Sequence, residues 1–148
     1  MLESIASFAT AAAVFVAAWQ LWLTRAQSRV GFEDGLSREY RDIAEGIPVK
    51  ALLGEELQEA EFEEAFRRFY RYIDLSNEQI FLRMEGRISL KTWRNWAGGI
   101  ESNLGRPAFR RAWKEIKDRS GGSFSELRRL ESDNFASDPK KWTRQSSS

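Results

Sequence analysis

The feature that most constrains this chain is an uncharged stretch from Ser4 to Thr24, bounded by Glu3 and Arg25. A helix rises about 1.5 Å per residue, so this stretch reaches about 30 Å, the thickness of the hydrocarbon core of a bilayer. Its apolar residues occupy every side of such a helix, and the rest of the chain is too short to enclose it. We therefore predict a single transmembrane anchor.

A cleaved signal peptide is the alternative interpretation of this stretch. It requires positive charge ahead of a shorter apolar core and small residues at the cleavage site. Here Glu3 is the only charged residue before the stretch, and the stretch ends in the bulky segment Trp19-Gln20-Leu21-Trp22-Leu23. The pattern favours a retained anchor.

The flanking charges predict how the anchor is oriented. No Lys or Arg precedes the stretch, whereas Arg25 and Arg29 follow it. The positive-inside rule then places the N-terminus outside and the C-terminal part in the cytoplasm, and Trp19 and Trp22 suit the inner interface. We expect a single-pass protein of the bacterial inner (plasma) membrane. The absence of cysteine agrees with a reducing compartment.

The predicted span is lopsided in side-chain size. Phe8, Phe15 and the two tryptophans share one side, and smaller residues share the other. The small or polar residues of this second side are Ala6, Ala9, Thr10, Ala13, Ala17 and Gln20. Transmembrane helices associate where small residues allow close backbone approach and polar groups share hydrogen bonds. The strip is therefore a candidate face for another membrane protein or for self-association, the alternative being an ordinary alanine-rich anchor.

The remaining residues predict an all-α protein, in which an aromatic-rich helical bundle follows the anchor. The chain has only three prolines, no sustained strand-like alternation, and apolar residues at helical spacing. We expect an anchor with a juxtamembrane extension over 1–30, a cytoplasmic bundle over 31–132 and a flexible polar tail over 133–148.

Local signals predict where the helices begin and end. Gly31 should loosen the chain after the anchor, and Gly86 and Ser89 should end one helix and cap the next. The pair Gly98-Gly99 should either break a helix or mark close backbone packing. The expected helices cover about 33–44, 48–53, 56–84, 89–104, 107–119 and 123–130, the last opened by a capping box from Ser123 to Glu126.

A polar segment, Asp74 to Gln79, interrupts the most aromatic of these helices. Asp74, Asn77 and Glu78 are candidates for a polar recognition site. The alternative is an exposed face, or a helix break in which Ser76 caps the next turn with Gln79 as its partner.

A basic block, Arg106 to Arg119, follows an acidic stretch, Glu55 to Glu64. The candidates for contact with anionic lipid headgroups are Arg110, Arg111, Lys114 and Lys117. The alternative is a solvated face paired with the acidic stretch. Nucleic acid is disfavoured as a partner because no known binding module is present.

The chain has neither histidine nor cysteine, which excludes His-based triads, thiol nucleophiles and the common zinc sites. It also lacks a glycine-rich phosphate loop. We predict no cofactor and no enzymatic activity. The alternative is a membrane-tethered enzyme that uses carboxylates and a divalent metal, for which Asp74 and Glu78 share a helix face.

Three segments carry a resemblance to known proteins: Phe69 to Gln79, Gly86 to Ser89, and Thr92 to Trp96. With these motifs, the chain resembles a family of small, uncharacterised bacterial proteins that have one N-terminal span and a cytoplasmic helical domain. The resemblance implies the architecture and no activity. From the residues and this resemblance we expect a membrane-anchored protein-interaction module, an accessory, assembly or regulatory subunit of a larger inner-membrane complex.

Overall fold

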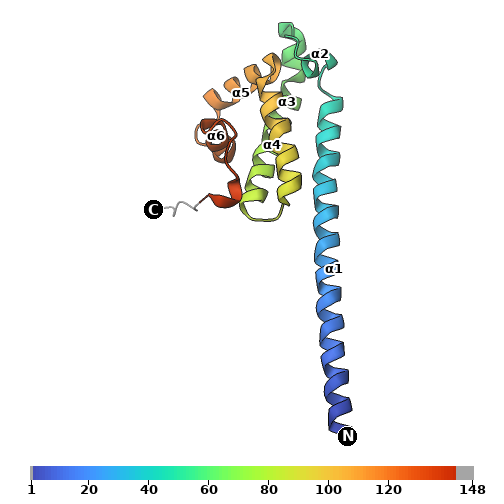
Figure 1. Cartoon of the computed structure of the whole chain (residues 1–148). Helices are drawn as coiled ribbons and strands as arrows, with labels where there is room; N and C mark the ends of the chain where they lie inside the picture. The colour runs from blue at the N-terminus through green and yellow to red at the C-terminus, as the bar shows by residue number, and fades with distance from the viewer. Residues whose placement is uncertain (1, 143–148) are drawn as a thin grey trace. The chain divides into compact units, whose positions relative to one another are not determined.

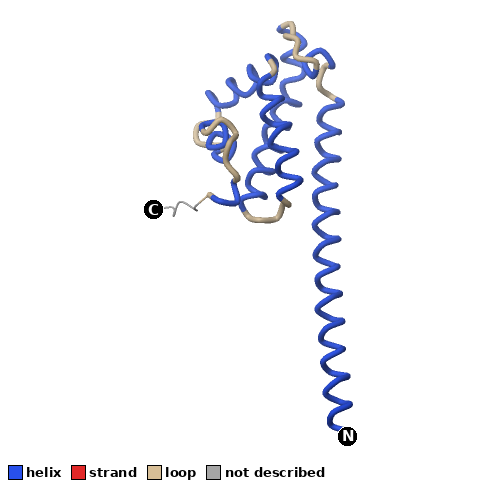
Figure 2. Tube along the Cα trace, viewed as in Figure 1, coloured by secondary structure: helices blue, strands red, loops and turns tan. Residues whose placement is uncertain are grey.

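The computed structural model describes residues 2–142, with side chains from residue 13 onward. This part of the chain contains helices and no strand, which confirms the all-α prediction (Figure 2). The helices in chain order are α1 (Leu2–Glu45), α2 (Val49–Leu52), α3 (Glu59–Met84), α4 (Leu90–Gly105), α5 (Pro107–Arg119), α6 (Ser125–Ser132) and the short 3-10 helix η1 (Pro139–Lys141) (Figure 1).

The chain divides into two compact units, Met1–Gly35 and Leu36–Ser148. We call the described residues of the second unit, 36–142, the bundle. Helix α1 belongs to both units, because it continues without a break through Gly31. The predicted loosening at Gly31 is therefore wrong. A glycine inside a helix costs only about 1 kcal/mol relative to alanine, and α1 remains helical on both sides of Gly31.

The core of the bundle is built around α3, which packs against α5, α6 and η1. Aromatic rings fill the contact between α3 and α5. The Phe109 ring lies edge-on to the Phe69 and Tyr72 rings, at centroid distances of 5.0 and 5.1 Å. Trp113 is also buried, and its indole nitrogen finds no hydrogen-bond partner among the described residues. Phe109, Trp113 and Ile116 form the buried apolar face of α5.

The turn between α3 and α4 forms as predicted. Gly86 has a φ of +72°, and its N–H donates to the Arg83 carbonyl while the Arg87 N–H donates to the Leu82 carbonyl. This pair of bonds is a Schellman motif, which satisfies the last carbonyls of the helix. Ser89 then caps α4 by accepting a hydrogen bond from the Thr92 N–H at 3.2 Å.

Helix α4 departs from expectation at Gly98-Gly99. The helix does not break there, and a β-carbon added at either glycine would meet no atom within 4 Å. Neither predicted explanation, a break or close packing, is correct, because both glycines face open space. Trp93 and Ile100 of this helix are buried, and Trp96 is half-buried.

The predicted capping box of α6 is also absent. Phe124 occupies the N-cap position in the left-handed conformation (φ 60°), which leaves Ser123 one residue too early to cap the helix. The first free N–H groups of α6 therefore need another partner.

Residues 133–142 differ from the flexible tail that we expected, whereas residues 143–148 lie outside the described part. Pro139 is buried, and Asp138 receives two hydrogen bonds from the Arg83 guanidinium, at 2.8 and 2.7 Å. The polar composition of this segment suggested solvent exposure. One of its carboxylates instead neutralises a buried cation on α3.

Candidate functional site

The predicted helix-packing strip lies on the first half of α1. Ala6, Ala9 and Thr10 are outside the described side chains, whereas Ala13, Ala17 and Gln20 are exposed. Among the described residues, no helix combines the length and apolar character that a membrane span requires.

The predicted interface residues Trp19, Trp22, Arg25 and Arg29 are exposed on the same helix. The two indole rings lie 5.6 Å apart between centroids, in a tilted arrangement. The Thr24 hydroxyl donates to the Gln20 carbonyl at 2.9 Å. The hydroxyl of this threonine is therefore satisfied within the helix itself.

The polar segment of α3 is fully helical, so the predicted break at Ser76 is wrong. Ser76 is buried and donates its hydroxyl to the Tyr72 carbonyl one turn earlier, at 2.8 Å. A serine that bonds back to its own helix keeps the helix intact, which is why it does not start a new one.

The three residues predicted as a recognition site have separate surroundings. Asn77 bonds to α6, with its carbonyl oxygen accepting from the Leu127 N–H and its amide donating to Glu126, both at 2.9 Å. Asp74 is exposed. Glu78 is largely exposed as well. The partial burial of its carboxyl is the main cause that raises its pKa, and the nearby carboxylates of Glu39 and Asp74 raise this pKa further.

The basic residues of α5 are held by different partners. Arg111 pairs with Glu59 of the acidic stretch at 2.6 Å. Lys114 pairs with Asp118 at 2.7 Å, while the Arg110 guanidinium donates to the Gly105 carbonyl. The pairing with the acidic stretch that we considered as an alternative is thus present at Arg111. Contact with lipid stays a prediction for this helix.

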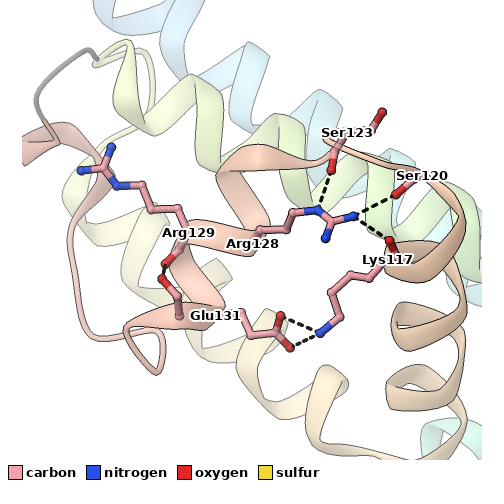
Figure 3. A network of polar contacts seen from close by, with 7 residues as sticks. Lys117, Ser120, Ser123, Arg128, Arg129 and Glu131 are labelled. Carbon is pink, nitrogen blue, oxygen red and sulfur yellow. Dashed lines mark hydrogen bonds and ion pairs between the residues drawn. The ribbon is translucent and has the colours of Figure 1, made fainter.

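Lys117 belongs to a polar network that joins α5 to α6 (Figure 3). Its ammonium pairs with Glu131 at 2.8 Å. Arg128 reaches back from α6 and donates to the carbonyls of Lys117 and Ser123 and to the Ser120 hydroxyl. An arginine at the C-terminal carbonyls of a helix is a favourable cap, so this network fixes the glycine-containing turn between the helices.

A cavity of about 290 Å³ opens in the bundle between the end of α1, α3 and α4. We call it the aromatic–amide cavity. Its lining residues are Ser37, Tyr40, Arg41, Tyr72, Gln79, Asn95, Trp96, Gly99, Ile100 and Asn103. The sequence interpretation did not identify this site. A signal was present nevertheless, because Tyr72, Ser76 and Gln79 follow one another at helical spacing on the buried face of α3.

Hydrogen bonds order one wall of the aromatic–amide cavity. The Asn103 amide donates to the Tyr72 hydroxyl at 3.0 Å, and its carbonyl oxygen accepts a bond from Arg106. Burial raises the pKa of the Tyr72 hydroxyl to about 12. Tyr72 therefore stays neutral at physiological pH.

The described residues contain no group of three or more acidic side chains close enough to hold a metal ion. Asp74, Glu78 and the nearby Glu39 therefore do not form such a group.

Comparison of the chain with family models, with curated proteins and with solved structures gives no match.

Proposed function

We propose that this protein is a single-pass protein of the bacterial inner membrane whose cytoplasmic bundle and transmembrane helix bind other proteins. In this proposal it acts as an accessory, assembly or regulatory subunit of a membrane complex. Residues 4–24 form the span, and residues 36–142 form the cytoplasmic domain.

The observation that carries the proposal is the exposure of large apolar side chains on α1. Their exposed fractions lie between 38 and 70%, and they are Val14, Phe15, Val16, Trp19, Leu21, Trp22 and Leu23. A contiguous apolar surface of this kind calls for a lipid or protein cover. In this proposal lipid is that cover, because residues 4–24 carry no charge.

The helical state of the stretch supports the same proposal. A bilayer offers no water to backbone polar groups, so a spanning segment must satisfy them internally, as an α-helix does. The bundle meanwhile has an aromatic core of its own around Phe69, Phe109 and Trp113. An anchor and an independently packed domain are the two parts that a tethered interaction module needs.

Carbonate extraction of bacterial membranes tests the anchor. The full chain should stay in the membrane pellet, and protease added outside spheroplasts should leave the bundle intact. Val14→Arg, which places a charge at the middle of the span, should reduce insertion at a cost of about 2.5–3.5 kcal/mol.

Ser28→Arg is the matched control, because it adds the same charge on the same helix beyond the span. This variant should stay membrane-bound. Release of the unmodified chain by carbonate, or equal behaviour of the two variants, would contradict the anchor.

Purification in mild detergent tests the binding function. A membrane protein that co-purifies in fixed proportion, or a defined oligomer of the chain itself, would support the subunit role. A monomer that carries no partner at native expression level would argue against it.

A further inference from the structure

Gln79 is a buried polar side chain without a hydrogen-bond partner among the described residues. Its exposed fraction is 6%, and it lines the aromatic–amide cavity. Its carboxamide is bonded to none of the described residues and is open to solvent in the cavity, because the Trp113 indole nitrogen is the one fully buried side-chain nitrogen or oxygen among them that lacks a partner. From this we propose that the aromatic–amide cavity is a binding site for a neutral nucleobase, whose edge bonds to Gln79.

The other buried polar groups of the cavity are already engaged. Asn103 uses its amide on Tyr72 and its carbonyl on Arg106. The buried Ser76 hydroxyl, one turn after Tyr72, donates to the Tyr72 carbonyl. The Gln79 carboxamide therefore supplies the cavity with one donor and one acceptor side by side, a pattern that recognises a ligand edge carrying the complementary pair.

Aromatic side chains supply the faces for a flat ligand. Tyr40 and Tyr72 lie edge to face at 6.1 Å, and the half-buried Trp96 lines the cavity from α4. Stacking on such rings is a general means of holding nucleobases. Glutamine pairs in bidentate fashion with the N6/N7 edge of adenine, so adenine fits the amide as well as the rings.

Size and charge narrow the ligand further. A volume of about 290 Å³ stands at the small end of ligand pockets, which suits one fused ring system rather than a large cofactor. Arg41 is the only charged residue among those that line the cavity, and it is exposed. The cavity therefore disfavours a positively charged ligand and can hold a neutral nucleobase.

Calorimetric titration of the full-length protein in mild detergent with adenosine tests the proposal. We expect saturable binding with a Kd below about 1 mM. N6,N6-dimethyladenosine keeps the ring but lacks the N6 donors, so its binding should be weaker by about tenfold or more. Indole, which is flat but lacks this edge, should bind no better than the dimethyl compound.

Gln79→Leu separates a binding role from a structural one. This variant removes an amide that has no hydrogen-bond partner among the described residues, so the midpoint of thermal unfolding should stay equal or rise. Adenosine affinity should fall by about tenfold or more. If Gln79 had a purely structural role, the unfolding midpoint of Gln79→Leu would be lower than that of the unmodified protein. The unmodified protein would then not bind adenosine.

Two neighbouring glycines of α4 provide a second test that does not depend on Gln79. Gly99 lines the aromatic–amide cavity, whereas Gly98 lines a different one near Phe135 and Asp138. An added β-carbon meets no atom within 4 Å at either position, so Leu should be accommodated at both. Gly99→Leu should abolish adenosine binding, while Gly98→Leu should leave it unchanged.

Three results would overturn the proposal. One is the absence of saturable adenosine binding to the unmodified protein. Another is equal affinity of Gln79→Leu and the unmodified chain. The third is equal affinity of the Gly99→Leu and Gly98→Leu variants, which would place any bound adenosine elsewhere on the molecule.

Discussion

Arg83 is the most enclosed charged residue described in the bundle, with an exposed fraction of 5%. Its guanidinium donates to both carboxylate oxygens of Asp138 and to the Ile88 carbonyl at 2.7 Å. One side chain thus joins the end of α3, the loop before α4 and the segment that leads into η1. A buried guanidinium needs such bonds, because an unpaired charge in the interior is strongly destabilising.

Replacing Asp138 by Asn should therefore lower the free energy of unfolding by about 3 kcal/mol, since it leaves the buried Arg83 without a counter-ion. Urea denaturation at neutral pH, followed by tryptophan fluorescence, measures this change. Asp74→Asn is the matched control on the exposed side of α3 and should change stability by less than about 0.5 kcal/mol. Equal losses in the two variants would contradict the role of the pair.

The same pair makes a prediction about pH. The hydrogen bonds from Arg83 hold the pKa of Asp138 below its ordinary value. A lowered pKa in the folded state stabilises the fold above the ordinary value of about 3.9, and this contribution is lost as pH falls through the folded pKa. The gap in unfolding midpoint between the unmodified protein and Asp138→Asn should therefore shrink below about pH 3.9. A difference in unfolding midpoint that stays constant down to pH 2.5 would contradict this role of the Asp138 carboxylate.

Among the helices, α6 obtains its N-terminal cap from another element. The Asn77 side chain on α3 accepts from the Leu127 N–H, which has no partner within the first turn of α6. This bond links α3 to α6.

Asn77→Ala should lower the free energy of unfolding by about 1 kcal/mol, the usual cost of losing a helix cap. Ser123→Ala is the informative control. Ser123 is the cap that the sequence predicts, and in the structure only its backbone carbonyl is bonded to Arg128. Thermal unfolding should show a lower midpoint for the Asn77 variant alone. A larger loss of stability in Ser123→Ala than in Asn77→Ala would show that Ser123 caps α6, as the sequence predicts.

These two helices show what the sequence could predict. Some local signals were correct, as at Gly86 and Ser89, because each sets the backbone at its own position. Other local signals were wrong, at Gly31, Ser76 and Ser123. Signals that depend on distant residues failed. Asn77 and Asp138 meet their partners across 49 or more residues, so no local pattern could identify either bond.

The aromatic–amide cavity was missed for a related reason. Gln79 looked like a surface or capping residue because its neighbours in the sequence are polar. Its burial depends on α4 and the end of α1, which cover that side of α3. The helical spacing of Tyr72, Ser76 and Gln79 places these polar residues on one face of α3. The spacing alone does not predict which elements pack against that face.

At the scale of the whole molecule, the bundle should fold without the first half of α1. A fragment covering residues 33–142 keeps Ile43, Arg83 and Asp138 together, whereas a fragment covering 33–133 loses the partner of Arg83. We expect the longer fragment to unfold cooperatively and the shorter one to be less stable by at least about 3 kcal/mol. Circular dichroism during heating compares them, and coincident curves would mean that residues 134–142 contribute nothing.

The last prediction concerns the anchor as a means of association. Ala13 lies on the small-residue strip, and Ala18 lies about 140° further around the same helix. Both alanines are exposed, and Leu at either position keeps the helix equally apolar. Membrane insertion should therefore be the same for Ala13→Leu and Ala18→Leu.

Association should nevertheless differ between the two variants. Close approach of transmembrane helices depends on small side chains at the contact, so Ala13→Leu should lose the co-purified partner or the crosslinked dimer, while Ala18→Leu keeps it. Crosslinking in intact membranes, quantified against total inserted protein, measures the difference. If both variants retain their partner, the strip serves only as part of the anchor, and association must depend on the surface of the bundle.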